Sequence, residues 1–146
     1  MEPDVLRKKA LDLLARREHS ALELEKKLLK GGAGREAVDE LLTDLADNGW
    51  QSDQRFAEQY LQSRINKGWG SRKISAELEQ RGVSERIIRE CLLNSETDWV
   101  ELARKVREKK FGHDLPQDWN EKSRQMRFLQ QRGFDPEDIR TAMKEE

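Results

Sequence analysis

The sequence predicts an all-α protein built from three tandem three-helix repeats. Apolar residues recur at spacings of three and four, and glycines fall where these apolar runs stop. A pattern of helices around one glycine also returns with a period of about 50 residues, which is typical of repeat proteins. No run alternates apolar and polar residues between hairpin turns, so no strand is expected.

Spacings of three and four place the apolar side chains on one face of a helix. Nine such runs are present, and each predicts a short helix of roughly 10–16 residues. In chain order the runs cover residues 5–14, 22–29, 38–45, 56–65, 74–78, 87–92, 99–106, 126–129 and 139–143.

Capping residues support these helices. Ser20 and Glu23 have the spacing of a capping box, which starts a helix near residue 21. Ser84 is placed to cap the sixth run, and Asp135-Pro136 supplies an N-cap and a first-turn proline to the last. The glycines at the ends of runs are Gly31, Gly32, Gly49, Gly68, Gly82, Gly112 and Gly133.

The second and third helices of each repeat align at constant offsets of 50 and 51 residues. The pattern breaks once, where Gln125 stands in the place of Leu24 and Ile74, and we expect Met126 to take the apolar role. The aligned sets are Leu24, Leu28, Gly32 and Val38, then Ile74, Leu78, Gly82 and Ile88, then Leu129, Gly133 and Ile139.

The expected repeats are residues 1–50, 51–96 and 97–146, each with three helices. The third contains an irregular loop at 111–122, where Pro116 interrupts the pattern. A unit of about 50 residues buries too little apolar surface to be stable alone. We therefore expect the repeats to stack into an elongated, curved body.

Composition limits the classes of function. Charged residues make up 39% of the chain, but the signs interleave and the net charge is −1. No run reaches the roughly 18 apolar residues of a membrane span, so no membrane association is expected. Cys91 is the one cysteine, and only His19 and His113 could join it as soft metal ligands. This pattern argues against disulfides and a metal site, and it suits a reducing cytoplasm.

No arrangement of residues indicates catalysis. The glycine-rich stretch 31–34 lacks the Lys-Ser/Thr pair of a phosphate-binding loop. The adjacent acids Asp39 and Glu40 point apart on a helix, and nothing places a nucleophile beside His19. We predict that the protein is not an enzyme and has no catalytic residues, no cofactor and no metal.

Basic clusters are the main candidates for a binding surface. One interpretation is a positive strip that contacts phosphates, since residues 99–134 carry nine basic and five acidic side chains. The other interpretation is that each cluster is simply a solvated helix face. The candidate partner-binding or DNA-binding residues are Arg16, Arg17, Lys67, Trp69, Arg72, Lys73, Arg104 and Lys105.

Trp69 allows two interpretations. It lies between two glycines and beside cations, so it can stack on a base or anchor an interface, or it can fold back over a groove between helices. Trp50, Trp99 and Trp119 are expected to pack between helices. Arg81 of the second repeat and Arg132 of the third precede the repeat glycines. Each is expected to donate to the last carbonyls of its own helix.

Three segments resemble the RecX regulatory family. They are LARREHSALELEKKL (14–28), DNGWQSDQRFAEQYLQSR (47–64) and KGWGSRKISAELEQRGV (67–83). The resemblance extends from about residue 5 to 145 and is loosest in the third repeat. It implies three tandem three-helix repeats, a fold that the periodicity predicts independently. It also implies a protein that binds the RecA recombinase filament on DNA and mainly inhibits its recombination, ATPase and co-protease activities.

Two hypotheses of function follow. In the first, the protein is a modulator of the RecA filament, acting as a monomer in the cytoplasm with weak direct contact to DNA. In the second, it is a free-standing DNA-binding protein of the helix-turn-helix type, because three-helix units can present a recognition helix. The near-zero net charge argues against the second, since a DNA-binding domain is usually strongly basic.

Overall fold

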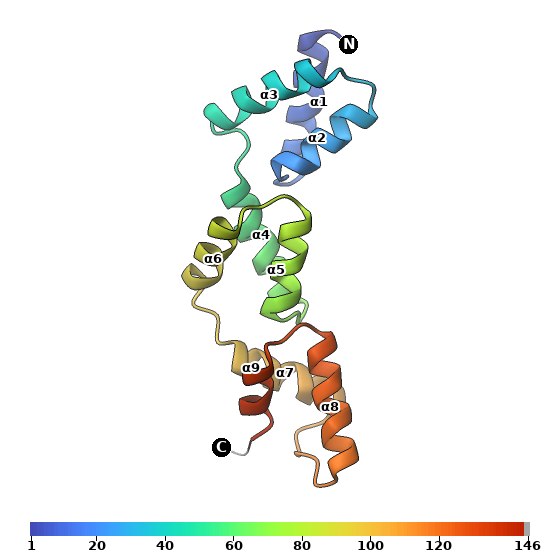
Figure 1. The fold of residues 1–146 in the computed structure, drawn as a ribbon, viewed down its shortest axis with the longest axis vertical. Coiled ribbons are helices and arrows are strands. Elements are labelled where there is room, and N and C mark those ends of the chain that lie inside the picture. Colours follow the sequence, from blue (N-terminus) through green and yellow to red (C-terminus); the bar gives the residue numbers. More distant parts are fainter. Residues whose placement is uncertain (145–146) are drawn as a thin grey trace. The chain divides into compact units, whose positions relative to one another are not determined.

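The computed structural model describes residues 1–144, and these form nine helices without a strand (Figure 1). The predicted all-α class is confirmed. The helices are α1 (Pro3–Arg16), α2 (Ala21–Lys30), α3 (Arg35–Asp47), α4 (Asp53–Asn66), α5 (Ser71–Gln80), α6 (Glu85–Asn94), α7 (Trp99–Phe111), α8 (Trp119–Gln131) and α9 (Pro136–Ala142).

The predicted caps start the helices. The Ser20 hydroxyl accepts a hydrogen bond from the Glu23 backbone N–H at 3.1 Å, and the Glu23 carboxylate accepts one from the Ser20 N–H at 3.1 Å. This reciprocal pair satisfies two donors that the first turn of α2 would otherwise leave unpaired. Ser84 caps α6 through the Ile87 N–H, and Asp135 caps α9 through the Glu137 N–H. The capping predictions are confirmed.

The repeated glycine closes the same type of turn three times. Gly32, Gly82 and Gly133 all have positive φ, at 98°, 81° and 89°. The N–H of the residue after each glycine donates to the carbonyl of the aligned leucine. The glycine N–H donates to the carbonyl of the residue that follows this leucine. This is the Schellman arrangement, whose left-handed position favours glycine. The bonds are Ala33 to Leu28, Val83 to Leu78 and Phe134 to Leu129.

The chain divides into two compact units. Unit 1 comprises Met1–Tyr60 and Leu78–Cys91, and unit 2 comprises Leu61–Glu77 and Leu92–Glu146. The division passes through α4, α5 and α6, so each unit holds three complete helices and parts of the middle ones. The aligned leucines are buried in both units, since Leu28, Leu78 and Leu129 are at most 3% exposed.

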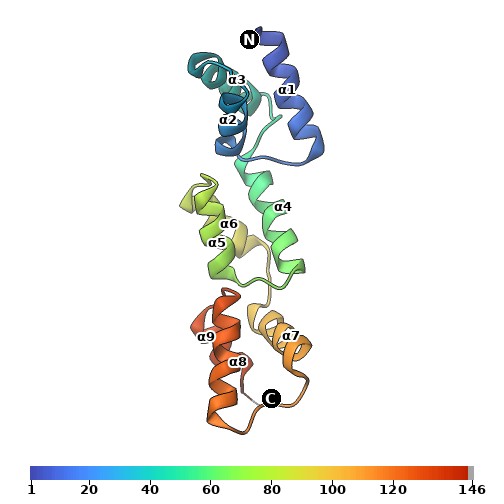
Figure 2. The ribbon, with the colours of Figure 1, turned by 90° about the vertical axis from the view of Figure 1, so that its right-hand side faces the viewer.

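In unit 1, α1, α2 and α3 lie together (Figure 2). They contact one another around a buried apolar cluster. The turn between α1 and α2 also contacts the start of α4. The buried Gln51 side chain donates to the His19 carbonyl at 3.2 Å, and the Asp53 carboxylate accepts from the Ala21 N–H at 2.9 Å. The cluster consists of Leu6, Ala10, Leu24, Leu28, Ala33, Val38, Leu41 and Leu45.

In unit 2, α7, α8 and α9 contact one another around a second cluster, which includes Leu129, Phe134 and Ile139. The expected exchange of roles at the break in the repeat is wrong. Gln125 itself is buried, and its side-chain carbonyl accepts from Arg107 at 3.2 Å, while Met126 packs against the cluster but is only partly buried. A polar residue is tolerated here because a second buried polar group pairs with it.

The tryptophans pack less than expected. Trp99 is half-buried against the unit 2 cluster, but Trp50 and Trp119 are 55% and 72% exposed, so the packing prediction is wrong for both. Trp50 follows Gly49 beyond the end of α3. Trp119 precedes the buried Gln125 by six residues, which at 3.6 residues per turn places it about 240° around α8. The core face of α8 therefore excludes it.

Candidate partner-binding surface

The eight candidate residues divide between the two units. Arg16 and Arg17 lie at the C-terminal end of α1 in unit 1, whereas the other six belong to unit 2. Each group therefore has the side chains of its own unit as neighbours.

In unit 1 a carboxylate neutralises Arg17. The Arg17 guanidinium donates to both carboxylate oxygens of Glu23, at 3.1 and 3.3 Å. Burial raises the pKa of Glu23, but the hydrogen bonds from Arg17 and the Ser20 backbone outweigh it, and the net pKa is lowered from its ordinary value. Arg17 thus stabilises the start of α2, because it pairs with a residue of the capping box.

Arg16 lines a small hollow in unit 1, with a volume of about 250 Å³. Lys9 and Lys27 line the same hollow, and so does the carboxylate of Asp12. The hollow therefore mixes both signs of charge.

In unit 2, Arg72 and Arg104 are engaged with the protein itself. Arg72 donates to the carboxylate of Asp135 at 3.3 Å, and Arg104 lies 3.8 Å from the carboxylate of Glu101. Both pairs are partly exposed, so each contributes little to stability.

Lys67 and Lys105 line a common groove in unit 2, with a volume of about 410 Å³. The end of α4 and one face each of α7 and α8 form it. Four further residues give it an apolar floor: Ile65, Leu102, Val106 and Phe128. Among the described residues that line the groove there is no carboxylate. Its cations are Lys67, Lys105, Lys109, Lys110 and Arg132.

Three of these cations are not among the candidate residues that the sequence predicts: Lys109, Lys110 and Arg132. The signal is present on α7, where Leu102, Lys105, Val106 and Lys109 are spaced by three, one and three residues and so share a helix face. Arg132 could not be found in this way, because α8 supplies it. Its predicted role is wrong, since it donates to the Lys67 carbonyl at 3.3 Å and not to its own helix.

Trp69 folds back against cations of its own unit. The Lys73 ammonium lies 4.9 Å from the centre of the Trp69 ring, and the Arg132 guanidinium lies 4.7 Å from it. Arg132 also lies 5.4 Å from the centre of Phe128, and Lys110 lies 5.2 Å from the same ring. Cation–π contact fixes the orientation of the side chains beside the groove.

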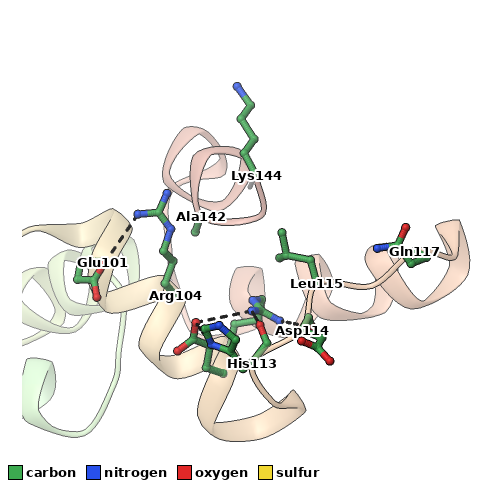
Figure 3. Close-up of a pocket in the computed structure, with 10 residues that line it drawn as sticks. Glu101, Arg104, His113, Asp114, Leu115, Gln117, Ala142 and Lys144 are labelled. Atoms are coloured by element: carbon green, nitrogen blue, oxygen red, sulfur yellow. Dashed lines mark hydrogen bonds and ion pairs between the residues drawn. The ribbon is translucent and has the colours of Figure 1, made fainter. Parts of the chain in front are cut away.

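A larger cavity of about 590 Å³ lies elsewhere in unit 2, beside the segment that joins α7 to α8 (Figure 3). Acidic and basic side chains both line it, and Figure 3 shows Glu101 joined to Arg104 while the Lys144 side chain points away from His113 and Asp114. Its charges are balanced within the cavity, which makes it a weaker candidate for a charged partner than the groove.

Arg107 in this region differs from its basic neighbours in the sequence. Its side chain is 2% exposed, so it is not part of a surface cluster. It donates to the carbonyls of His113 and Asp114, at 3.0 and 3.4 Å, and to Gln125. Arg107 thereby anchors the segment between α7 and α8 to the unit.

Two further searches concern metal ligands and long apolar helices in the part of the chain that the structure describes. No group of three or more His, Cys, Asp or Glu side chains within residues 1–144 could hold a metal ion. None of the described helices combines the length and the hydrophobicity that crossing a bilayer requires.

Three family models match consecutive parts of the chain. They describe the first, second and third three-helix domains of RecX and match residues 7–45, 52–92 and 96–143. The matches confirm the predicted series of three three-helix repeats.

Curated relatives match nearly the whole chain. "Regulatory protein RecX" of Halorhodospira halophila is 44% identical over 139 residues, which cover 95% of this chain and 86% of the relative. "Regulatory protein RecX" of Chromohalobacter salexigens is 45% identical over 135 residues, covering 92% and 88%.

Solved structures share the fold. A crystal structure of RecX from Lactobacillus salivarius matches with a TM-score of 0.82 and 24% identity, covering 97% of this chain and 94% of that one. A second structure, titled "Crystal structure of regulatory protein RecX", matches with a TM-score of 0.84 and 22% identity, covering 98% and 72%. On the family models and the curated relatives, the chain belongs to the RecX family, whose members are regulatory proteins rather than enzymes.

Proposed function

We propose that this protein binds the RecA recombinase filament on DNA and mainly inhibits its recombination, ATPase and co-protease activities. Its relatives are named as regulatory proteins, and the matches to them extend over all three repeats. That regulatory role supports the proposal, and the groove of unit 2 supplies a surface for it.

The observation that carries the proposal is the unbalanced charge of this groove. Five cations line it, and none of the described lining residues is acidic. In unit 1, by contrast, the predicted Arg17 is paired with Glu23. Cations without nearby carboxylates attract an anionic partner over several ångströms and accelerate its association. A filament of protein on DNA offers such anionic groups.

The repeats suit contact with a polymer. We propose that residues 1–50, 51–96 and 97–146 act as three linked contact modules of one monomer. Several weak contacts on one chain add up, because the first contact raises the effective concentration of the others. A cytoplasmic location and a weak direct contact to DNA belong to the same proposal.

The alternative is a free-standing DNA-binding protein. The cations of the groove favour it, but the net charge of −1 does not. Binding through phosphates alone weakens steeply between about 50 and 200 mM salt, and bare single strands would bind as tightly as the filament.

A DNA-dependent ATPase assay tests the proposal. The protein is titrated, at molar ratios below one per RecA protomer, into RecA assembled on single-stranded DNA at fixed salt. We expect ATP hydrolysis to fall as the titration proceeds, and affinity for the filament to exceed affinity for the same DNA without RecA. Unchanged hydrolysis, together with equal affinity for filament and bare DNA, would support the alternative instead.

A further inference from the structure

We propose that the groove of unit 2 receives an acidic amphipathic protein segment, in which carboxylates flank at least one bulky apolar side chain. The inference rests on the proposed function, because it assigns this segment to the recombinase protomer and not to the DNA. It names a partner of one chemical class for one groove.

The rim of the groove favours carboxylates. Lys105 and Lys109 are exposed cations on α7, and Lys67 is an exposed cation just beyond α4. A lysine ammonium is a mobile point charge, so it can follow carboxylates along a peptide without demanding one fixed geometry. Arg132 adds a planar guanidinium whose position is already set by Trp69, Phe128 and the Lys67 carbonyl. Little side-chain freedom is then lost when Arg132 binds a carboxylate.

The floor of the groove separates a protein segment from a nucleic-acid backbone. Ile65, Leu102 and Val106 are half-buried aliphatic side chains that still line the open groove. A sugar–phosphate backbone offers charge but no bulky aliphatic group to cover them. An amphipathic segment satisfies both the rim and the floor, because its apolar side chains leave water when its carboxylates meet the lysines.

The aromatic rings beside the groove do not favour base stacking. Trp69 already contacts Lys73 and Arg132, and Phe128 already contacts Lys110 and Arg132. A base stacked on either ring competes with these cations for the same π system. A protein segment needs no such displacement.

Site-specific photo-crosslinking tests the assignment. The photoreactive residue p-benzoylphenylalanine replaces Asn66, an exposed and uncharged residue that lines the groove. A control variant carries it in place of Asn120, which is exposed at the start of α8 and does not line the groove. Each variant is mixed with RecA filaments on poly(dT), sedimented, irradiated and analysed by mass spectrometry.

From Asn66 we expect crosslinks to one RecA peptide that contains several Asp or Glu residues around a bulky apolar residue. The Asn120 control should not yield this peptide. Crosslinks to the DNA, crosslinks to a RecA peptide without carboxylates, or no crosslink from a variant that sediments normally would each overturn the inference. Failure to sediment with the filament, for wild type as well, would instead reject the proposed function.

Two substitutions separate charge from apolar contact. Lys105→Gln removes one rim charge, and Val106→Thr replaces one methyl group of the floor with a hydroxyl. We expect each to weaken sedimentation with the filament by about three- to fivefold, the effect of one charge pair or one buried methyl group. Loss for Lys105→Gln without loss for Val106→Thr would indicate a polyanion site and would contradict the inference. Thermal melts of both variants establish that they fold.

Discussion

The two Arg-Gly turns, Arg81-Gly82 in unit 1 and Arg132-Gly133 in unit 2, share a backbone geometry and differ in what the arginine contacts. Arg81 lies 3.9 Å from the Glu23 carboxylate and 4.8 Å from the centre of the Tyr60 ring. Arg132 lies over two aromatic rings and donates to a backbone carbonyl. The fold therefore requires the glycine in both turns. The neighbouring arginine differs: Arg81 lies beside a carboxylate, whereas Arg132 lines a groove that has no carboxylate among its described lining residues.

The glycines also differ in how closely the chain approaches them. A Cβ atom on Gly82 would lie 2.8 Å from the Leu22 side chain. A Cβ atom on Gly133 would lie 2.2 Å from the Lys73 Cβ and 2.7 Å from the Lys73 backbone nitrogen. In unit 1, the Arg-Gly turn of the second repeat therefore packs against the first turn of α2. In unit 2, the Arg-Gly turn of the third repeat packs against the first turn of α5.

The largest expected effect comes from adding a methyl group at these turns. Gly133→Ala should lower the free energy of unfolding by about 3 kcal/mol or more, because backbone must move to make room. Gly82→Ala should cost less, because its nearest contact, Leu22 Cβ, is 2.8 Å away, whereas a Cβ atom on Gly133 approaches Lys73 to 2.2 Å. Urea unfolding followed by circular dichroism measures both variants.

Two other glycines serve as matched controls. Gly32 in unit 1 and Gly112 in unit 2 have positive φ, but a Cβ atom there meets nothing within 4 Å. Alanine at Gly32 should cost only the backbone strain of about 1–2 kcal/mol. Alanine at Gly112 should cost about 1–3 kcal/mol, because its φ of 94° and ψ of 174° lie in a region that is nearly restricted to glycine. Equal losses at all four positions would show that close packing of the Arg-Gly turns contributes nothing.

The next largest effect concerns one repeat position that is apolar in unit 1 and polar in unit 2. Leu24 is fully buried in unit 1, whereas Gln125 accepts a hydrogen bond from the buried Arg107 in unit 2. Gln125→Leu should cost about 1–3 kcal/mol, because it leaves the guanidinium without one acceptor. Adding Arg107→Met should recover part of that loss.

Urea unfolding of the single and double variants measures this coupling. A Gln125→Leu variant more stable than wild type would mean that position 125 is an ordinary core position of the repeat. The buried pair would then have no structural role.

A smaller effect is expected from pH at one buried histidine of unit 1. The ring of the buried His19 lies 3.0 Å from the Arg17 carbonyl through Nδ1 and 2.9 Å from the Lys27 ammonium through Nε2. Burial lowers the pKa of His19 from 6.5, and the charges of Arg17 and Lys27 add to this effect, while the hydrogen bond to the Arg17 carbonyl opposes it. The neutral ring therefore suits the fold.

The sign of the pH effect follows from linkage. As the pH is lowered below 6.5, the unfolded chain takes up a proton at His19 before the folded chain does. The free energy of unfolding therefore decreases as the pH decreases, until the pH is below the pKa of His19 in the folded chain. His19→Gln should flatten the dependence, which urea unfolding at a series of pH values measures. An identical profile for wild type and His19→Gln would contradict this account.

The repeat and its caps could be predicted because local chemistry determines them. Glycine at a left-handed position and Ser20 or Asp135 at a helix start act on their immediate neighbours, so the sequence alone reveals them. The burial of Arg107 could not be predicted in this way. Its partners Gln125 and the carbonyls after α7 are brought to it only by the packing of α8 against α7.

The candidate surface could be predicted only in part for the same reason. The basic neighbours of Lys67 and Lys105 in the sequence predict both as candidates, and both line one groove. Arg17 has the same local signal, but Glu23 neutralises it. Whether a cation is available to a partner depends on the carboxylates that tertiary packing brings near it. A run of basic residues in the sequence does not show where these carboxylates lie.

The most direct test of the central claim compares charge reversal in the two units. Lys105→Glu with Lys109→Glu reverses two charges of the groove in unit 2. Lys9→Glu with Arg16→Glu makes the same change of charge at the hollow of unit 1. The dissociation constant for RecA filaments on DNA is measured for both variants at fixed salt, with helical content checked by circular dichroism. We predict a loss of about tenfold or more for the groove variant and of less than about threefold for the hollow variant. Equal losses, or a larger loss for the hollow variant, would contradict the assignment of binding to the groove.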